Sequence, residues 1–367
     1  MPKSRLHQLS ALGQSVWIDN LSRESIHGGH LARLMREDTV VGVTSNPTIF
    51  QKAISGGPAY DEQLKELAGE RDAKEIFLQL TAVDITDACE LMRPVHEKTK
   101  GLDGYVSWEV DPNLAYDTEA SYEEAMRLHG WIERPNLYVK IPATMPGLPA
   151  IEDMIAAGRS INITLIFSLD RYAAVAEAYL RGLERLVASG GDPTKVSSVA
   201  SFFVSRVDTE TDKRLEALGA PDRLKGKLAI ANAKLAYRHY KETFAGERWE
   251  FLASKGARKQ RCLWASTSTK NPAYPDTLYV DGLIGPETVN TMPDETIEAF
   301  QDHGKVALTL EKGLAQAHKL LDELAEAGVD YDDVTTTLEE EGVQKFADSF
   351  EELLDGIREK HGQVVAA

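Results

Sequence analysis

The segment Leu137-Tyr138-Val139-Lys140-Ile141-Pro142 is apolar except for a single lysine in its interior. A nearly continuous apolar run of this length is typical of a strand in a parallel sheet that is covered on both faces. Lysine is rarely buried there without compensation, and burial lowers the pKa of its amine from about 10.4. The neutral amine is a nucleophile that forms Schiff bases with carbonyl compounds. The alternative is a structural Lys140 at the rim of the sheet, with its amine extended into water.

Short β-like runs alternate along the chain with amphipathic helical stretches. One such stretch follows Ser168, where apolar residues recur at helical spacing through Tyr172, Val175, Tyr179 and Leu183. Alternating strands and helices indicate parallel pairing, and eight is the number of strands that closes a (β/α)₈ TIM barrel. We expect the strands at Ser15–Asp19, Val40–Thr44, Tyr105–Val110, Leu137–Lys140, Ser160–Phe167, Ser197–Phe203, Arg261–Ser266 and Thr277–Gly282.

Additional helices are expected at three places along the barrel. The connection between the second and third strands is too long for one crossover helix, and it predicts helices at Tyr60–Ala68 and Ala73–Lys98. The C-terminal region has an apolar stripe at helical spacing, which predicts a helix packed on the barrel. We therefore expect a single domain over residues 1–367, with helical insertions near 55–100 and 211–256 and a helical C-terminal extension near 305–361. The stripe consists of Phe346, Phe350, Leu353, Leu354 and Ile357.

The chain is acidic, with a formal net charge of −17. This balance argues against nucleic acid and anionic membranes as partners. The charge is unevenly placed, because residues 321–367 contain 14 acidic and three basic residues and so carry −11 of the total. The rest of the chain is only mildly acidic, so an anionic small substrate is not excluded. Nothing in the sequence indicates an oligomeric state.

Two distant cysteines, Cys89 and Cys262, form neither a disulfide framework nor a zinc site. The N-terminus has no apolar region after its charged residues, and no apolar run is long enough to cross a bilayer. We expect buried free thiols in a cytoplasmic protein. The pair His27 and His30 has a spacing seen in metal sites, but the glycines between them and a helical surface setting favour a chance pair. Since no nucleotide or metal motif occurs, we expect neither a cofactor nor a metal.

Strand alternation places the polar residues on one side of each strand. Asp19 ends the first strand, Glu109 lies near the end of the third, and Lys140 ends the fourth. Asn46 follows the second strand, and Asn162 and Thr164 share a face of the fifth. Because barrel enzymes keep their active sites at the carboxyl ends of the strands, these side chains are expected to meet in the barrel lumen.

Two carboxylates and a lysine in one buried ring have two interpretations. Such a group forms a structural ion network in some proteins, but buried networks are costly to desolvate. Clustered groups with perturbed pKa values favour a functional site. Imine chemistry needs these parts: a lysine attacks a ketone, one carboxylate shuttles protons, and a second base deprotonates the hydroxyl beside the breaking C–C bond.

A series of motifs at the strand ends resembles the transaldolase family. The resemblance covers the barrel from Asp19 to about Thr291, with the motifs in the family order. The motifs are Thr44-Ser45-Asn46-Pro47-Thr48-Ile49-Phe50, Trp108-Glu109-Val110-Asp111, Tyr138-Val139-Lys140-Ile141-Pro142-Ala143-Thr144, Ile161-Asn162-Ile163-Thr164-Leu165-Ile166-Phe167-Ser168, Ala200-Ser201-Phe202-Phe203-Val204-Ser205-Arg206 and Ala265-Ser266-Thr267-Ser268-Thr269-Lys270-Asn271-Pro272.

The resemblance implies a cofactor-free class I transferase of the pentose phosphate pathway. Such an enzyme moves a dihydroxyacetone unit from sedoheptulose 7-phosphate to glyceraldehyde 3-phosphate, giving erythrose 4-phosphate and fructose 6-phosphate. Lys140 matches the Schiff-base lysine, Glu109 the acid/base that acts through a water, and Thr164 the residue that holds this water. Asp19 matches the group that serves the substrate hydroxyl during cleavage.

The resemblance also implies substrate-binding residues. Asn46 and Asn162 match the residues that bind the dihydroxyacetone hydroxyls, and Ser201 would line the same pocket. Arg206 matches the phosphate-binding arginine of the family. A second such arginine, expected after the seventh strand, is absent, and Lys270 is the nearest cation. A lysine holds phosphate as a point charge, and the resemblance leaves open which of Ser266, Ser268 and Lys270 contacts it.

Two other functions fit the same residues. A free aldolase of the fructose-6-phosphate aldolase kind would release dihydroxyacetone instead of transferring it. A metal-dependent lyase would use Asp19 and Glu109 as ligands and Lys140 as a base, and its sensitivity to chelators would separate it from an imine enzyme. A protein that only binds sugar phosphates has no need of a buried amine between carboxylates.

Overall fold

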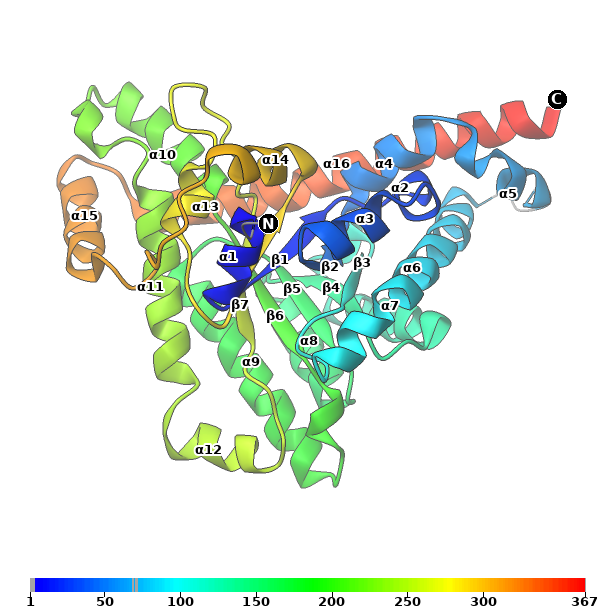
Figure 1. Cartoon of the computed structure of the whole chain (residues 1–367), viewed down its shortest axis with the longest axis horizontal. Helices are drawn as coiled ribbons and strands as arrows, with labels where there is room; N and C mark the ends of the chain where they lie inside the picture. The colour runs from blue at the N-terminus through cyan, green and yellow to red at the C-terminus, as the bar shows by residue number, and fades with distance from the viewer. Residues whose placement is uncertain (1–3, 68, 70–71, 367) are drawn as a thin grey trace.

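The computed structural model describes residues 4–67, 69 and 72–366. Its strands form a closed, all-parallel barrel that is surrounded by helices (Figure 1). Each strand pairs with its neighbours in sequence, and β1 pairs with β8. The predicted (β/α)₈ barrel is therefore confirmed. The strands are β1 (Gln14–Asp19), β2 (Val40–Thr44), β3 (Val106–Glu109), β4 (Leu137–Pro142), β5 (Ile161–Ile166), β6 (Ser198–Phe203), β7 (Arg261–Ala265) and β8 (Thr288–Met292).

Helices surround the barrel and extend beyond it. Those of the first half are α1 (Arg5–Ala11), α2 (Arg23–His27), α3 (His30–Glu37), α4 (Pro47–Ser55), η1 (Pro58–Tyr60), α5 (Asp61–Glu66), α6 (Ala73–Lys98), η2 (Pro112–Leu114), α7 (Thr118–Ile132) and α8 (Gly147–Ala156). Those of the second half are α9 (Leu169–Ala188), η3 (Pro193–Lys195), α10 (Ser205–Ala217), η4 (Asp222–Leu224), α11 (Leu228–Thr243), α12 (Gly246–Ser254), α13 (Leu278–Gly282), α14 (Asp294–His303), α15 (Leu314–Glu326) and α16 (Tyr331–Ala366).

The extra helices lie where the sequence predicts them. The first insertion contains the end of α4, η1, α5 and α6, and the second contains most of α10 with α11 and α12. Ala68, the last residue of the expected helix Tyr60–Ala68, lies outside the described residues. The C-terminal extension contains α15 and most of α16. None of the helices in the described part of the chain combines the length and the apolar character that a bilayer span needs.

The prediction of the eighth strand was wrong. The expected strand Thr277–Gly282 is the helix α13, and the strand that closes the barrel is Thr288–Met292. Tyr279 and Val280 are buried in α13, and a short apolar run has the same composition in a buried helix as in a strand. The true strand is less apparent in the sequence because Thr288 and Asn290, both fully buried, interrupt its apolar character.

Alternation along β1 positions its polar side chains inside the barrel. Trp17 donates a hydrogen bond of 3.1 Å to Asp103, and Asp19, two residues further along the strand, accepts one of 2.7 Å from Thr44. Asp103 also forms a buried ion pair of 2.9 Å with Arg261 of β7. Trp17 and Asp19 thus share the face that alternation predicts, with Asp19 at the carboxyl end.

The long C-terminal helix α16 lies across the end of the barrel where α4 and α10 begin (Figure 1). It is fixed by an ion pair of 3.1 Å between Glu339 and Arg171, and by a hydrogen bond of 2.9 Å from Thr48 to Ser349. Its apolar stripe is buried, as in Phe346 and Phe350. The predicted packing of a C-terminal helix on the barrel is therefore observed, and this helix lies at the same end as the predicted site.

Candidate active site

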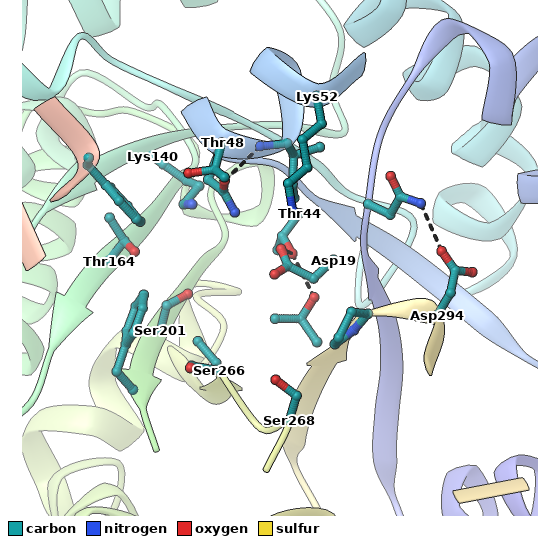
Figure 2. A pocket seen from close by; sticks show the side chains of 18 of the residues that line it. Asp19, Thr44, Thr48, Lys52, Lys140, Thr164, Ser201, Ser266, Ser268 and Asp294 are labelled. Carbon is teal, nitrogen blue, oxygen red and sulfur yellow. Dashed lines mark hydrogen bonds between the residues drawn. The ribbon is translucent and has the colours of Figure 1, made fainter. Parts of the chain in front are cut away.

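A cavity of about 590 Å³ opens at the carboxyl ends of the strands. Its wall includes eight of the ten residues that the sequence nominates, namely Asp19, Asn46, Lys140, Thr164, Ser201, Arg206, Ser266 and Lys270. Figure 2 shows Asp19 near the middle of this cavity, with Lys140, Thr164 and Ser201 on one side of it and Asp294 on the other. The other two predicted residues, Glu109 and Asn162, are not part of the wall but contact residues that are.

Lys140 and Glu109 form a buried pair beneath the cavity. They are partners in the register of β3 and β4, so their side chains leave the sheet side by side on the same face. The amine Nζ of Lys140 donates to Glu109 Oε2 at 3.0 Å and to the carbonyl oxygen of Ser45 at 2.9 Å. The two side chains are 7% and 4% exposed, which places the amine in the environment that the strand pattern predicts.

Burial changes the acidity of the Glu109 carboxyl. Desolvation raises its pKa, and the adjacent Lys140 offsets part of this rise while the charge of Asp19 adds to it. Its second oxygen, Oε1, is buried and has no hydrogen-bond partner among the described residues, and the same is true of Thr164 Oγ1. One oxygen of Glu109 therefore holds the amine, and the other is free to exchange a proton with a bound molecule.

Asp19 is a second carboxyl group in the cavity with different partners. It accepts a hydrogen bond of 2.7 Å from Thr44, whose hydroxyl also shares one of 2.6 Å with Thr291 (Figure 2). Desolvation raises the pKa of Asp19, while the hydrogen bond from Thr44 and the charges of Lys140 and Lys270 lower it. The net rise makes Asp19 a stronger base than an ordinary aspartate.

Two asparagines and a serine near the amine of Lys140 are fixed by hydrogen bonds to neighbouring residues. Asn46 is the N-cap of α4, and its side-chain oxygen accepts from the backbone N–H of Ile49 at 3.1 Å. Its amide N–H groups are then available to the cavity. Asn162 is fully buried, donates to Ser107 at 3.0 Å, and accepts from Ser201 at 2.6 Å. Asn162 therefore fixes the hydroxyl of Ser201 at the cavity wall.

Two cationic side chains, Arg206 and Lys270, line the part of the cavity formed by α10 and the loop after β7. Arg206 lies in the first turn of α10, and its Nη1 is buried without a hydrogen-bond partner among the described residues. Desolvation lowers the pKa of this guanidinium. Lys270, in the loop after β7, donates to Ser268 at 2.6 Å, and Ser266 shares a hydrogen bond of 2.9 Å with Ser205 at the start of α10. This arrangement offers cations and hydroxyl donors to an anion.

The structure adds residues to the wall that sequence reasoning missed. Lys52 extends from α4 into the cavity (Figure 2), and Asp294 and Glu295 border it after β8. Phe346 of α16 also lines it. A cation in the helix that Asn46 caps, six residues further along, was a signal for Lys52. The apolar stripe of α16, by contrast, gave Phe346 the same pattern as its packing neighbours.

The two histidines with a metal-like spacing point to separate partners. His27 contacts Asp87 at 2.8 Å, and His30 contacts Asp294 at 2.6 Å. Within residues 4–67, 69 and 72–366, no three His, Cys, Asp or Glu side chains form a group that would hold a metal ion. His27 and His30 therefore belong to surface and cavity-rim contacts.

Comparisons with known proteins show the family to which the chain belongs. A sequence model of the family described as transaldolase/fructose-6-phosphate aldolase matches residues 16–357. A transaldolase of Parafrankia sp. (strain EAN1pec) is 55% identical over 365 residues, which cover 98% of this chain and 99% of the relative. The transaldolases of Acidothermus cellulolyticus, 55% identical over 95% of this chain and 94% of the relative, and of Thermobifida fusca, 52% identical over 97% and 98%, are similar as well. The chain therefore belongs to the transaldolase/fructose-6-phosphate aldolase family.

Proposed function

We propose that the protein is a transaldolase that transfers a dihydroxyacetone unit from sedoheptulose 7-phosphate to glyceraldehyde 3-phosphate, giving erythrose 4-phosphate and fructose 6-phosphate. The observation that carries this proposal is the buried Lys140–Glu109 pair at 3.0 Å, with the separate carboxyl of Asp19 in the same cavity. An amine and two independently placed carboxyls are the groups that imine formation and C–C cleavage require.

The first step forms the imine. Nζ of Lys140 attacks the C2 carbonyl of the donor ketose, and the oxygen accepts a proton to give a carbinolamine. Loss of this hydroxyl as water needs a second proton, which Glu109 supplies. Support comes from Glu109 Oε1 and Thr164 Oγ1, which are both buried and without hydrogen-bond partners among the described residues. In the proposal they hold the water through which the proton moves.

The second step breaks the bond between C3 and C4. Asp19 removes the proton of the C4 hydroxyl, the aldehyde product leaves, and the bonding electrons pass to the iminium as an enamine on Lys140. The raised pKa of Asp19 makes it a stronger base than an ordinary carboxylate. Addition of the acceptor aldehyde reverses these events, and hydrolysis of the new imine releases the product ketose.

Binding of the substrate is divided along the cavity. In the proposal, Asn46 and Ser201 bind the hydroxyls of the dihydroxyacetone unit, Asn162 acts with them through the hydroxyl of Ser201 that it holds, and Arg206 binds the phosphate. The loop after β7 supplies the remaining phosphate contacts from Ser266, Ser268 and Lys270. The free Nη1 of Arg206 and the hydroxyls of this loop support the assignment.

A cytoplasmic location and imine chemistry without a metal complete the proposal. The thiols of Cys89 and Cys262 are buried and free, as suits a reducing compartment. Asp19 and Glu109 belong to no group of three or more His, Cys, Asp or Glu side chains among the described residues, which favours the imine enzyme over a metal-dependent lyase. The name of the family also includes an aldolase, so release of free dihydroxyacetone is the second candidate function.

A product assay separates the two functions. Sedoheptulose 7-phosphate is incubated with and without glyceraldehyde 3-phosphate, and erythrose 4-phosphate, fructose 6-phosphate and free dihydroxyacetone are measured, with and without a chelator. We expect ketose cleavage to depend on the acceptor and to be unaffected by the chelator. Dihydroxyacetone release at the same rate in the absence of acceptor would establish the aldolase instead, and loss of activity to the chelator would contradict both imine functions.

A further inference from the structure

The C-terminal helix supplies an aromatic ring to the cavity. Phe346 of α16 lines the wall together with Lys140 and Thr164 and is 6% exposed. In Figure 2, the pale red ribbon of α16 lies at the edge of the view, on the same side as Lys140 and Thr164. A residue more than 200 positions after Lys140 in the sequence is thereby part of the same small space.

The ring of Phe346 is equally close to two cations. Its centroid lies 5.9 Å from Nζ of Lys140 and 5.9 Å from Cζ of Arg206. Because Lys140 is the proposed site of the imine and Arg206 the proposed site of the phosphate, the ring borders the span between them. The carbon atoms of the departing aldehyde would occupy that span.

The position of the ring is fixed by the packing of α16. Four residues before Phe346, the backbone of Gly342 packs closely on β5, since a Cβ atom added at Gly342 would lie 3.1 Å from the side chain of Leu165. After it, Ser349 accepts the hydrogen bond from Thr48 of α4. Glu339 forms its ion pair with Arg171 one turn earlier than Gly342. The helix is therefore held against the barrel on both sides of Phe346, and the ring does not depend on a flexible segment.

The space between Lys140 and Arg206, which Phe346 borders, affects the fate of the intermediate after the C–C bond has broken. At that point Lys140 carries an enamine, which has two fates. Addition of its carbon to an acceptor aldehyde completes transfer, whereas protonation of that carbon gives the dihydroxyacetone imine, which adds water and releases dihydroxyacetone with the free amine. Once the first aldehyde has left, water that enters its place supplies the proton for the second fate. Closure of a site against water suppresses side reactions of this kind.

We propose that Phe346 determines the partition between transfer and release, by keeping the space between the imine and the phosphate site apolar after the first aldehyde leaves. This inference rests on the proposed transaldolase function and adds a specificity-determining residue to it. The ring makes no proton transfer itself. Its effect is on which reactant reaches the enamine.

The test compares three variants of the full-length protein. Phe346→Ala removes the ring, and Phe346→Leu retains part of the apolar surface. Phe350→Leu is the matched control, because Phe350 lies one helical turn further along α16, is 2% exposed, and packs edge-on against Phe77 at 5.4 Å outside the cavity. With fructose 6-phosphate as donor and erythrose 4-phosphate as acceptor, the readout is free dihydroxyacetone per molecule of sedoheptulose 7-phosphate formed.

We expect this ratio to rise about tenfold or more in Phe346→Ala and about two- to threefold in Phe346→Leu. It should be unchanged in Phe350→Leu. If Phe346→Ala does not fold, the rise in Phe346→Leu over Phe350→Leu decides. An unchanged ratio in the Phe346 variants, or an equal rise in Phe350→Leu, would overturn the inference and show that the ring only packs the helix.

Failure of the inference is distinguishable from failure of the proposed function. The wild-type protein is assayed in the same series for acceptor-dependent formation of sedoheptulose 7-phosphate. If the wild type transfers and the ratio does not respond to Phe346, the function stands and the inference falls. If the wild type releases dihydroxyacetone without any transfer, the proposed function falls, and with it the partition that Phe346 was inferred to set.

Discussion

At the scale of single residues, the two carboxyl groups of the cavity have different surroundings. Glu109 is paired with Lys140 and has one free oxygen, whereas Asp19 is held by Thr44. Burial raises the pKa of both groups. The same physical cause therefore acts on two carboxyls that are positioned for two different proton transfers.

We predict that Glu109→Gln and Asp19→Asn impair different steps. A carboxamide cannot shuttle protons, so Glu109→Gln should slow imine formation and hydrolysis about 100-fold or more. Asp19→Asn should form the imine but cleave it slowly, so that the unbroken ketose adduct accumulates. Borohydride trapping with fructose 6-phosphate, followed by mass analysis of the reduced adduct, separates a three-carbon from a six-carbon species. Identical trapped species formed at wild-type rates in both variants would contradict these roles.

At the scale of elements, three helices meet at a buried carboxyl that lies two residues after Arg206 in α10. Asp208 of α10 accepts from the backbone N–H of Ala229 in α11 at 2.7 Å and from the hydroxyl of Tyr279 in α13 at 3.1 Å. Desolvation, with a smaller contribution from the charge of Asp212, raises the pKa of Asp208 to about 7, although its hydrogen bonds lower it. The junction is therefore most stable while this group is protonated.

The stability of the protein should consequently depend on pH through Asp208. The folded protein retains this proton up to about pH 7, whereas the unfolded chain releases it near 3.8. The unfolded state thus binds fewer protons in this window, and the contribution of Asp208 to the free energy of unfolding falls as pH rises, by up to about 1.4 kcal/mol per pH unit. Asp208→Asn should flatten this dependence in urea titrations between pH 4.5 and 7.

The control for this prediction is Asp222→Asn. Asp222 lies in the nearby η4, and its side chain is 90% exposed. Its removal changes the net charge by the same amount but should leave the slope of stability against pH as in the wild type. Equal slopes in wild type and Asp208→Asn would show that the carboxyl is ionised throughout.

The elements also show how far the sequence predicts the fold. The strand predicted at Leu137–Lys140 is observed as Leu137–Pro142, because its nearly continuous apolar run lies in a chain that alternates such runs with helical stretches. The lumen positions of Asp19, Glu109 and Lys140 followed from alternation alone. The helix α13 was mistaken for a strand because hydrophobic periodicity does not distinguish a short apolar helix from a short buried strand. Phe346 could not be assigned to the cavity, since which turn of a packed helix meets the barrel mouth depends on long-range contacts.

At the scale of the whole molecule, an acidic protein offers a cationic wall to its substrate. The net charge is −17, yet the cavity wall includes Lys52, Lys140, Arg206 and Lys270 together with the acidic Asp19, Asp294 and Glu295. Much of the excess negative charge lies in residues 321–367. Because exposed charges are screened beyond about 8–10 Å, a bound phosphate should respond mainly to the charges of the cavity wall and to Glu341 of α16, whose charge acts on Arg206.

We predict that Arg206→Ala and Lys270→Ala weaken the use of phosphorylated acceptors. Each charge-assisted contact contributes about 1.5–3 kcal/mol, so KM for glyceraldehyde 3-phosphate should rise roughly ten- to a hundredfold. The loss should appear mainly in KM, because the phosphate lies away from the breaking bond. It should be much smaller for glyceraldehyde, which has no phosphate for these side chains to bind. Lys213→Ala, an exposed charge of α10 that is not part of the cavity wall, is the control. Equal penalties with both acceptors would mean that other residues hold the phosphate.

The central claim is that Lys140 forms the covalent intermediate, and the most direct measurement is the identity of the modified lysine. The wild-type protein is reduced with borohydride in the presence of fructose 6-phosphate, and the adduct is mapped by mass spectrometry, with Lys140→Ala in parallel. Lys52 and Lys270 line the same cavity and are internal comparisons. We expect a dihydroxyacetone-derived mass on Lys140 and an inactive, unmodified Lys140→Ala variant. An adduct on Lys52 or Lys270, or transfer activity that persists in Lys140→Ala, would contradict the central claim.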